Sequence, residues 1–140
     1  ADQQQRRIYR YTIVAKKNPK ASKDDGTYRL RASGPPITIL LDHEVEWITV
    51  DRAGALYFTE RSSNSVSKIP GEVVEEIASG RIAAEALNRV YSASASSYMY
   101  AEGTFRIETL YHAHKGFDRV NHPSGIAVDG MRLYWANMGN

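Results

Sequence analysis

Two closely spaced histidines, His112 and His114, have a spacing that is usable for metal binding. Residues at positions i and i+2 of a strand point to the same face, and two imidazole nitrogens on one face can bind a metal ion. The sequence offers no third ligand beside them, so the competing interpretation is a pair of partly exposed loop histidines. His43 and His122 each precede an alternating apolar stretch by a few residues, which predicts that they lie at the ends of strands.

No motif for a nucleophile or a bound phosphate accompanies these histidines. The sequence has no G-x-S-x-G, H-E-x-x-H, Walker or G-x-G-x-x-G pattern. It also has no cysteine, which excludes disulfides, thiolate catalysis and cysteine-ligated metals. We therefore assign no catalytic residue from the sequence.

The charge of the chain is divided unevenly along its length. Residues 1–33 hold nine Lys or Arg against three acidic residues, whereas residues 34–140 hold nine against thirteen. Such a basic segment is either a solvated surface or an extension that docks on an acidic protein surface, anionic lipid or nucleic acid. Nucleic acid is not expected, because neither a recognition helix nor an RNA-binding motif is present. The residues expected to bind a protein partner are Arg6, Arg7, Tyr9, Arg10, Tyr11, Tyr28, Arg29 and Arg31.

Alternation of apolar and polar residues predicts that residues 1–36 form a basic arm made of a strand or a long hairpin. Residues 7–14 and 27–32 alternate and are rich in β-branched and aromatic residues. The polar residues 15–26 between them contain Asn, Pro and Gly, which favour a loop. Residues 1–6 are polar without a pattern, so we expect them to be disordered or to lie along a neighbouring molecule.

Beyond the arm, two segments share one layout. Residues 48–60 and 126–137 each have an apolar alternating run that ends in Asp, a turn with Gly, and Leu-Tyr followed by an aromatic residue. In the first copy, Asp51 and Gly54 occupy the first and fourth positions of a predicted type I turn. A weaker copy at residues 91–102 gives a repeat of about 40 residues, the length of one four-stranded propeller blade.

The segments between these copies predict further elements. The sequence Ser-Gly-Pro-Pro at residues 33–36 favours a turn, followed by a strand at residues 37–41. Residues 66–70 and 73–78 are predicted as the third and fourth strands of the first repeat. The predicted remaining elements are a short Ala-rich helix within residues 80–89 and the outer strand of the second copy at residues 105–111.

The last repeat carries a family resemblance. Residues 123–137, Pro-Ser-Gly-Ile-Ala-Val-Asp-Gly-Met-Arg-Leu-Tyr-Trp-Ala-Asn, resemble the repeat of NHL, YWTD and related β-propellers. The resemblance implies an all-β fold, a partial β-propeller of about three four-stranded antiparallel blades that follows the basic arm. By the period, the blades are residues 37–80, 81–120 and 121–140, the last one incomplete. A closed propeller has roughly 4 to 8 blades, so we expect the remaining blades of the same propeller, or another protein, to cover the open ends.

The resemblance also implies a metal site. In the similar senescence-marker and gluconolactonase-like propellers, carboxylate and amide side chains that start the inner strands hold a central divalent cation. The matching positions here are Glu46 and Asn88, whose oxygens suit Ca²⁺ or another divalent cation. The third matching position is Ser124, which departs from the carboxylate or amide ligand. The alternative is that these are polar residues at the rim of a channel and that no cofactor is bound.

Three functions follow from these observations. The leading hypothesis is a non-enzymatic propeller segment that acts as a scaffold for protein–protein interaction, as an accessory subunit of a larger complex. The alternative is a fragment of a metal-dependent propeller enzyme of the gluconolactonase-like or lyase-like kind. A third interpretation is an extracellular ligand-binding module of the YWTD type.

Membrane contact and compartment are only weakly constrained by the sequence. The sequence has no apolar run of roughly 20 residues, so any membrane association would be peripheral and through a complex. The chain begins with Ala1, which suggests processing and favours an extracytoplasmic or organelle-lumen compartment.

Overall fold

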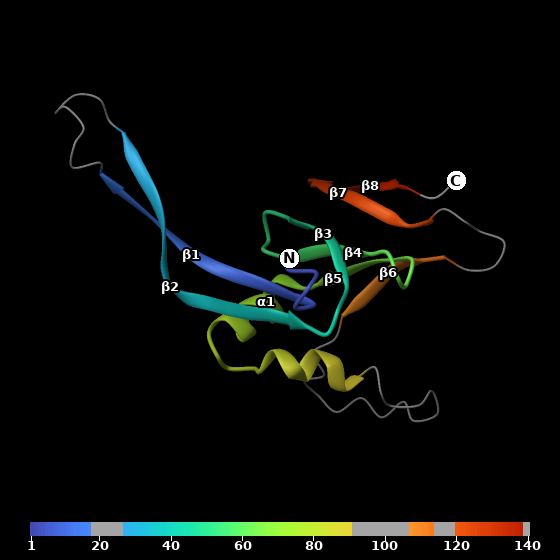
Figure 1. The fold of residues 1–140 in the computed structure, drawn as a ribbon, viewed down its shortest axis with the longest axis horizontal. Coiled ribbons are helices and arrows are strands. Elements are labelled where there is room, and N and C mark those ends of the chain that lie inside the picture. Colours follow the sequence, from blue (N-terminus) through green and yellow to red (C-terminus); the bar gives the residue numbers. More distant parts are fainter. Residues whose placement is uncertain (18–26, 91–106, 114–119, 139–140) are drawn as a thin grey trace.

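The computed structural model describes residues 1–17, 27–90, 107–113 and 120–138 of the chain (Figure 1). Its elements are β1 (Arg7–Lys17), β2 (Tyr28–Leu41), β3 (Val45–Val50), β4 (Leu56–Glu60), β5 (Ser65–Ile69), α1 (Gly71–Ala78), the 3₁₀ helix η1 (Ala84–Val90), β6 (Glu108–His112), β7 (Pro123–Asp129) and β8 (Arg132–Asn137). All strand pairs are antiparallel, in one four-stranded and two two-stranded sheets. The prediction of a mainly β fold is therefore confirmed.

The predicted hairpin arm is present, and it is longer than the sequence indicated. β1 and β2 pair along their length and extend away from the rest of the chain (Figure 1). β2 runs to Leu41, so the predicted domain boundary at residue 36 falls inside a strand. The inner half of the hairpin packs into the core, where Ile8, Ile39 and Leu40 are buried.

The turn predicted at residues 33–36 is a bend within β2 instead. Arg10 pairs with Ile37 and Thr12 pairs with Ser33, so residues 34–36 together oppose a single residue, Tyr11. Gly34 adopts a φ of 78°, which a side chain would disfavour. The two prolines that follow lack an N–H for the ladder. The irregular register bends the hairpin without ending the strand.

Residues 1–6 fold back on the start of β1, contrary to the expectation of disorder. The Asp2 and Arg7 backbones exchange two hydrogen bonds, of 2.8 and 3.0 Å. The Asp2 carboxylate also accepts a 3.0 Å bond from the Gln5 amide. This turn places the N-terminal glutamines beside the start of β3, where Gln3 Nε2 donates to Glu46 Oε2 at 3.1 Å.

The four-stranded sheet has the order β3-β4-β5-β6, and its first turn is the one predicted. Gly54 N donates to Asp51 O at 3.1 Å, and Asp51 Oδ1 accepts bonds of 2.9 Å from the amides of Ala53 and Ala55. Partial desolvation acts to raise the Asp51 pKa, but these bonds and one from the Tyr57 hydroxyl outweigh it and hold the pKa below its usual value. Asp51 is thus fixed in a structural role.

Two assignments around this sheet were wrong. The predicted fourth strand at residues 73–78 is the helix α1, in which Val73, Val74 and Ile77 are buried along one helical face. The fourth strand is β6, which pairs with β5, so the strand predicted as the outer edge of a blade at residues 81–120 belongs to the first sheet.

A short helix was predicted within residues 80–89, and η1 confirms it. The weaker repeat copy at residues 91–102 lies outside the described residues.

The last repeat copy forms the two-stranded sheet β7-β8, which packs on β3 and β4 (Figure 1). Thr59 Oγ1 donates to Ser124 O at 2.9 Å in a buried contact between the layers. The rings of Tyr111 and Trp135 also meet, with centroids 4.7 Å apart. The main core lies on the other side of the four-stranded sheet, between that sheet, the two helices and the inner half of the hairpin. None of the helices in the described ranges is long and apolar enough to cross a membrane.

Candidate functional site

The basic and aromatic residues predicted to bind a partner separate into two groups in space. Arg6, Tyr9 and Arg10 make contacts within the chain. Arg6 Nη2 donates to Asp42 O at 2.8 Å, and Arg10 Nη1 lies 2.6 Å from Glu75 Oε1 of α1. The Tyr9 hydroxyl donates to Gln5 Oε1. Arg10 holds the inner half of the hairpin against α1, whereas Arg6 and Tyr9 brace the N-terminal turn and the base of the hairpin. Arg7 is exposed where its backbone pairs with Leu41.

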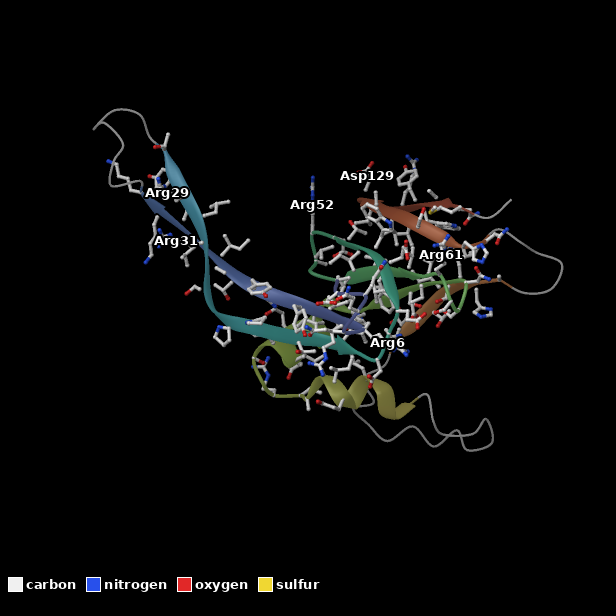
Figure 2. All side chains as sticks on the ribbon, in the orientation of Figure 1. Arg6, Arg29, Arg31, Arg52, Arg61 and Asp129 are labelled. Atoms are coloured by element: carbon white, nitrogen blue, oxygen red, sulfur yellow. The ribbon has the colours of Figure 1, made fainter. Side chains whose placement is uncertain are left out.

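The other group, Tyr11, Tyr28, Arg29 and Arg31, lies on the part of the hairpin that projects from the body. We call residues 12–17 and 28–33, with Tyr11 at their inner end, the outer ribbon. Arg29 and Arg31 are seen there, far along the hairpin from Arg6 (Figure 2). All four side chains are exposed.

The register of the outer ribbon gives it two unlike faces. Ile13 pairs with Ala32, Ala15 with Leu30, and Lys17 with Tyr28. Paired residues share a face, and successive residues alternate between faces. One face, the apolar face, therefore carries Tyr11, Ile13, Ala15, Tyr28, Leu30 and Ala32, with Lys17 at its outer end. The opposite face, the basic face, carries Thr12, Val14, Lys16, Arg29, Arg31 and Ser33.

The apolar face is open to solvent over its whole length. Tyr11 and Ile13 are 51% and 63% exposed, and Tyr28 and Leu30 are 63% and 70% exposed. An isolated two-stranded ribbon is at best marginally stable in water, because neither of its faces is covered. An exposed apolar ribbon of this kind is typical of an interaction element.

A second feature is a polar cavity of about 610 Å³ at the end of the body where β3 and β7 begin. Its lining residues are Gln3, Gln4, Arg6, Glu44, Glu46, Arg61, Ser62, Asn64 and His122. Arg6 Nη1 lies 3.8 Å from Glu44 Oε1 across part of it. The His122 amide donates to Asn64 Oδ1 at 2.7 Å, which ties the start of β7 to the loop between β4 and β5. Charges of both signs line the cavity.

The two residues predicted to bind a divalent cation do not occupy equivalent places. Glu46 lies near the start of β3 and lines the cavity. Asn88 lies in η1 rather than at the start of a strand. Ser124 is buried in β7, and its carbonyl accepts the bond from Thr59. Among residues 1–17, 27–90, 107–113 and 120–138, no three His, Asp or Glu side chains are grouped to hold a metal ion.

The histidines are likewise dispersed. His112 ends β6 and is exposed, and His114 lies outside the described residues. His43 Nδ1 lies 2.9 Å from Glu60 Oε1, and both side chains are largely buried. Glu60 also accepts a 3.4 Å bond from the Ser65 hydroxyl. This pair was not predicted from the sequence, although the predicted hairpin centred on the Asp51 turn already brings the end of β4 opposite the start of β3.

Comparison with known proteins gives no relative: no protein-family model, no curated protein and no solved structure matches this chain.

Proposed function

We propose that this chain is a non-enzymatic segment of a β-propeller that serves as a docking scaffold, and that the outer ribbon is the element that binds its protein partner. The observation that carries the proposal is the apolar face, which leaves four large side chains half or more exposed on a projecting ribbon. A ribbon that is only marginally stable while uncovered gives a partner a defined surface to complete.

The arrangement of the body supports the propeller part of the proposal. Four antiparallel strands form one sheet, and a second sheet packs on it through the Thr59 to Ser124 bond and the Tyr111 and Trp135 rings. Adjacent propeller blades pack face to face in this way, since one sheet cannot cover both of its own faces. Strands that complete β7-β8 would come from the same propeller or from another protein in the assembly.

Site-specific photo-cross-linking in extracts of the native source tests the docking role. A photo-reactive residue in place of Leu30 is expected to give one discrete adduct, because this side chain is at the centre of the apolar face and 70% exposed. The matched control carries the same group in place of Glu72, which is exposed on α1. The absence of an adduct at Leu30, or the same adduct pattern at both positions, would contradict the docking role.

A second candidate, a metal-dependent propeller enzyme, is favoured by one observation, the position of Glu46 at the start of β3 in the wall of the cavity. Glu46 Oε2 already accepts the bond from Gln3, and Ca²⁺ takes 6–8 oxygen ligands, more than a single glutamate supplies. This candidate therefore needs several oxygen ligands besides Glu46, from the other residues of the cavity wall or from outside the described residues.

Calcium titration distinguishes the two candidates. For a non-enzymatic scaffold, we expect about 1 mM Ca²⁺ to change the melting temperature of the wild type and of Glu46→Gln equally, within about 1 °C. Glu72→Gln serves as the control for non-specific binding to surface carboxylates. A rise of several degrees in the wild type and in Glu72→Gln that is absent in Glu46→Gln would favour the enzyme instead.

A further inference from the structure

The apolar face carries an alternating pattern of large and small side chains. On two successive rungs of this face, a large residue faces an alanine: Ile13 pairs with Ala32, and Leu30 pairs with Ala15. The large residue changes strand from one rung to the next, so each alanine leaves a hole between projecting neighbours. A surface of this kind packs well against another surface with the same pattern, because knobs of one fit holes of the other.

We propose that the outer ribbon binds the outer ribbon of a second copy of this chain, apolar face to apolar face. This inference rests on the proposed docking function and names the partner. The two ribbons would form a small four-stranded sandwich around a two-fold axis. Such an axis makes the contact isologous, so the same residues are used in both copies.

The bodies of the two copies determine which two-fold axis is allowed. Each outer ribbon has the body at its inner end only (Figure 1). An axis parallel to the strands would bring both bodies to the same end of the sandwich, where they compete for space. An axis perpendicular to the strands, through the rung of Val14 and Arg31, places the bodies at opposite ends.

The perpendicular axis also matches the side chains. It places β1 over β1 of the second copy in the opposite direction, so that Ile13 lies over Ala15 of the second copy. On β2 it places Leu30 over Ala32 of the second copy. At the ends it brings Lys17 over the ring of Tyr11 of the second copy, where an ammonium group is attracted to the ring face. Ile13 and Leu30 each meet an alanine, and the one charge on the face meets an aromatic ring.

The area available predicts a weak dimer. At roughly 200 Å² for a large side chain, the exposed fractions of Tyr11, Ile13, Tyr28 and Leu30 leave about 500 Å² of apolar surface on one ribbon. Two ribbons would bury about 1,000 Å², near the lower limit for a specific interface. We therefore expect a dissociation constant in the micromolar range.

The charges are compatible with this dimer. The basic faces point away from each other on the outside of the sandwich, and packed sheets are separated by about 10 Å. At physiological ionic strength the screening length is about 8 Å, so their mutual repulsion is small. Added salt is expected to strengthen the association, because it reduces this repulsion and favours apolar contact.

Sedimentation velocity of the full chain, from about 1 to about 300 µM, tests the dimer. The wild type is expected to shift from monomer to dimer across this range. Ile13→Thr and Leu30→Thr place a β-branched residue with good strand propensity at each position and should weaken the association by about tenfold or more. Val14→Thr makes the same kind of change on the basic face and should alter it by less than about twofold. A wild type that stays monomeric, or a Val14→Thr variant as weak as Leu30→Thr, would overturn the proposal.

Cysteine cross-linking tests the arrangement, since the chain has no cysteine of its own. A mixture of the single variants Ile13→Cys and Ala15→Cys is expected to form disulfide-linked dimers faster than a solution of either variant alone. A mixture of Ile13→Cys and Ala32→Cys should not, because that pairing belongs to the axis parallel to the strands. Cross-linking only in the second mixture would overturn the perpendicular axis.

The photo-cross-linking experiment separates failure of this inference from failure of the docking role. An adduct at Leu30 with the mass of two copies supports both. An adduct with a different protein, together with a monomeric wild type, overturns the second copy as partner and leaves the docking role intact. Binding of the monomer to phosphatidylserine vesicles that is lost in Leu30→Thr would assign the face to a lipid surface and overturn both.

Discussion

Removal of residues 1–33 is expected to unfold the body, whereas removal of the outer ribbon alone is not. Ile8 is only 2% exposed and packs with Ile39 and Leu40 in the main core. Loss of a buried isoleucine costs about 2–5 kcal/mol, and the truncation also removes the backbone partner of β2 and the Arg10 contact with Glu75. Since a domain is stable by about 5–15 kcal/mol, little stability would be left.

The matched variant replaces residues 13–32 with an Asn-Gly turn and keeps the Thr12 and Ser33 rung. A two-residue loop of this kind closes an antiparallel pair without strain. Residues 13–17 and 27–32 lie in the outer half of the hairpin, outside the main core, so we expect a stability within about 1 kcal/mol of the wild type and a loss of ribbon-dependent association. Near-ultraviolet circular dichroism and thermal melting measure the folded state of both variants. Cooperative melting of the 1–33 truncation at the wild-type temperature would show that the inner half of the hairpin is dispensable.

Local patterns in the sequence were sufficient to predict the hairpins. The alternation in residues 7–14, 48–60 and 126–137 is a property of neighbouring residues, and turn residues such as Asp51 and Gly54 fix where each strand reverses. The helix α1 was missed because Val73, Val74 and Ile77 are β-branched and favour strands locally. Their spacing along one helical face is satisfied only once a core is present to cover it.

Contacts between distant segments could not be predicted. β6 pairs with β5 across a long intervening segment, and the sequence of β6 alone does not specify its neighbour. The same reason explains why the predicted partner-binding residues included some that make contacts within the chain. Tyr9, Arg10 and Arg31 look alike as exposed polar residues of a basic arm, but the partner of Arg10 is Glu75, which lies 65 positions later. Only the three-dimensional arrangement separates residues that hold the hairpin from residues that are available to a partner.

The contact between α1 and the Asp51 turn predicts a second large effect, in Gly71→Ala. A Cβ atom at residue 71 would lie 2.3 Å from Ala53 O and 3.1 Å from Ala55 N. These are backbone atoms of a turn that the Asp51 carboxylate already holds by hydrogen bonds, so the turn cannot move aside without breaking them. We expect a loss of about 3 kcal/mol in the free energy of unfolding, measured by urea denaturation.

Gly125→Ala is the matched control, because a Cβ atom at residue 125 of β7 meets nothing within 4 Å. Its stability should stay within about 0.5 kcal/mol of the wild type. α1 also carries Glu75, so a displaced helix would weaken the Arg10 contact that holds the hairpin to the body. Gly71→Ala should therefore increase the hydrogen exchange of β1 amides near Arg10 as well as lowering stability. Equal losses of stability in the two glycine variants would contradict the close approach of α1 to the turn, and unchanged exchange near Arg10 would show that the hairpin is held without α1.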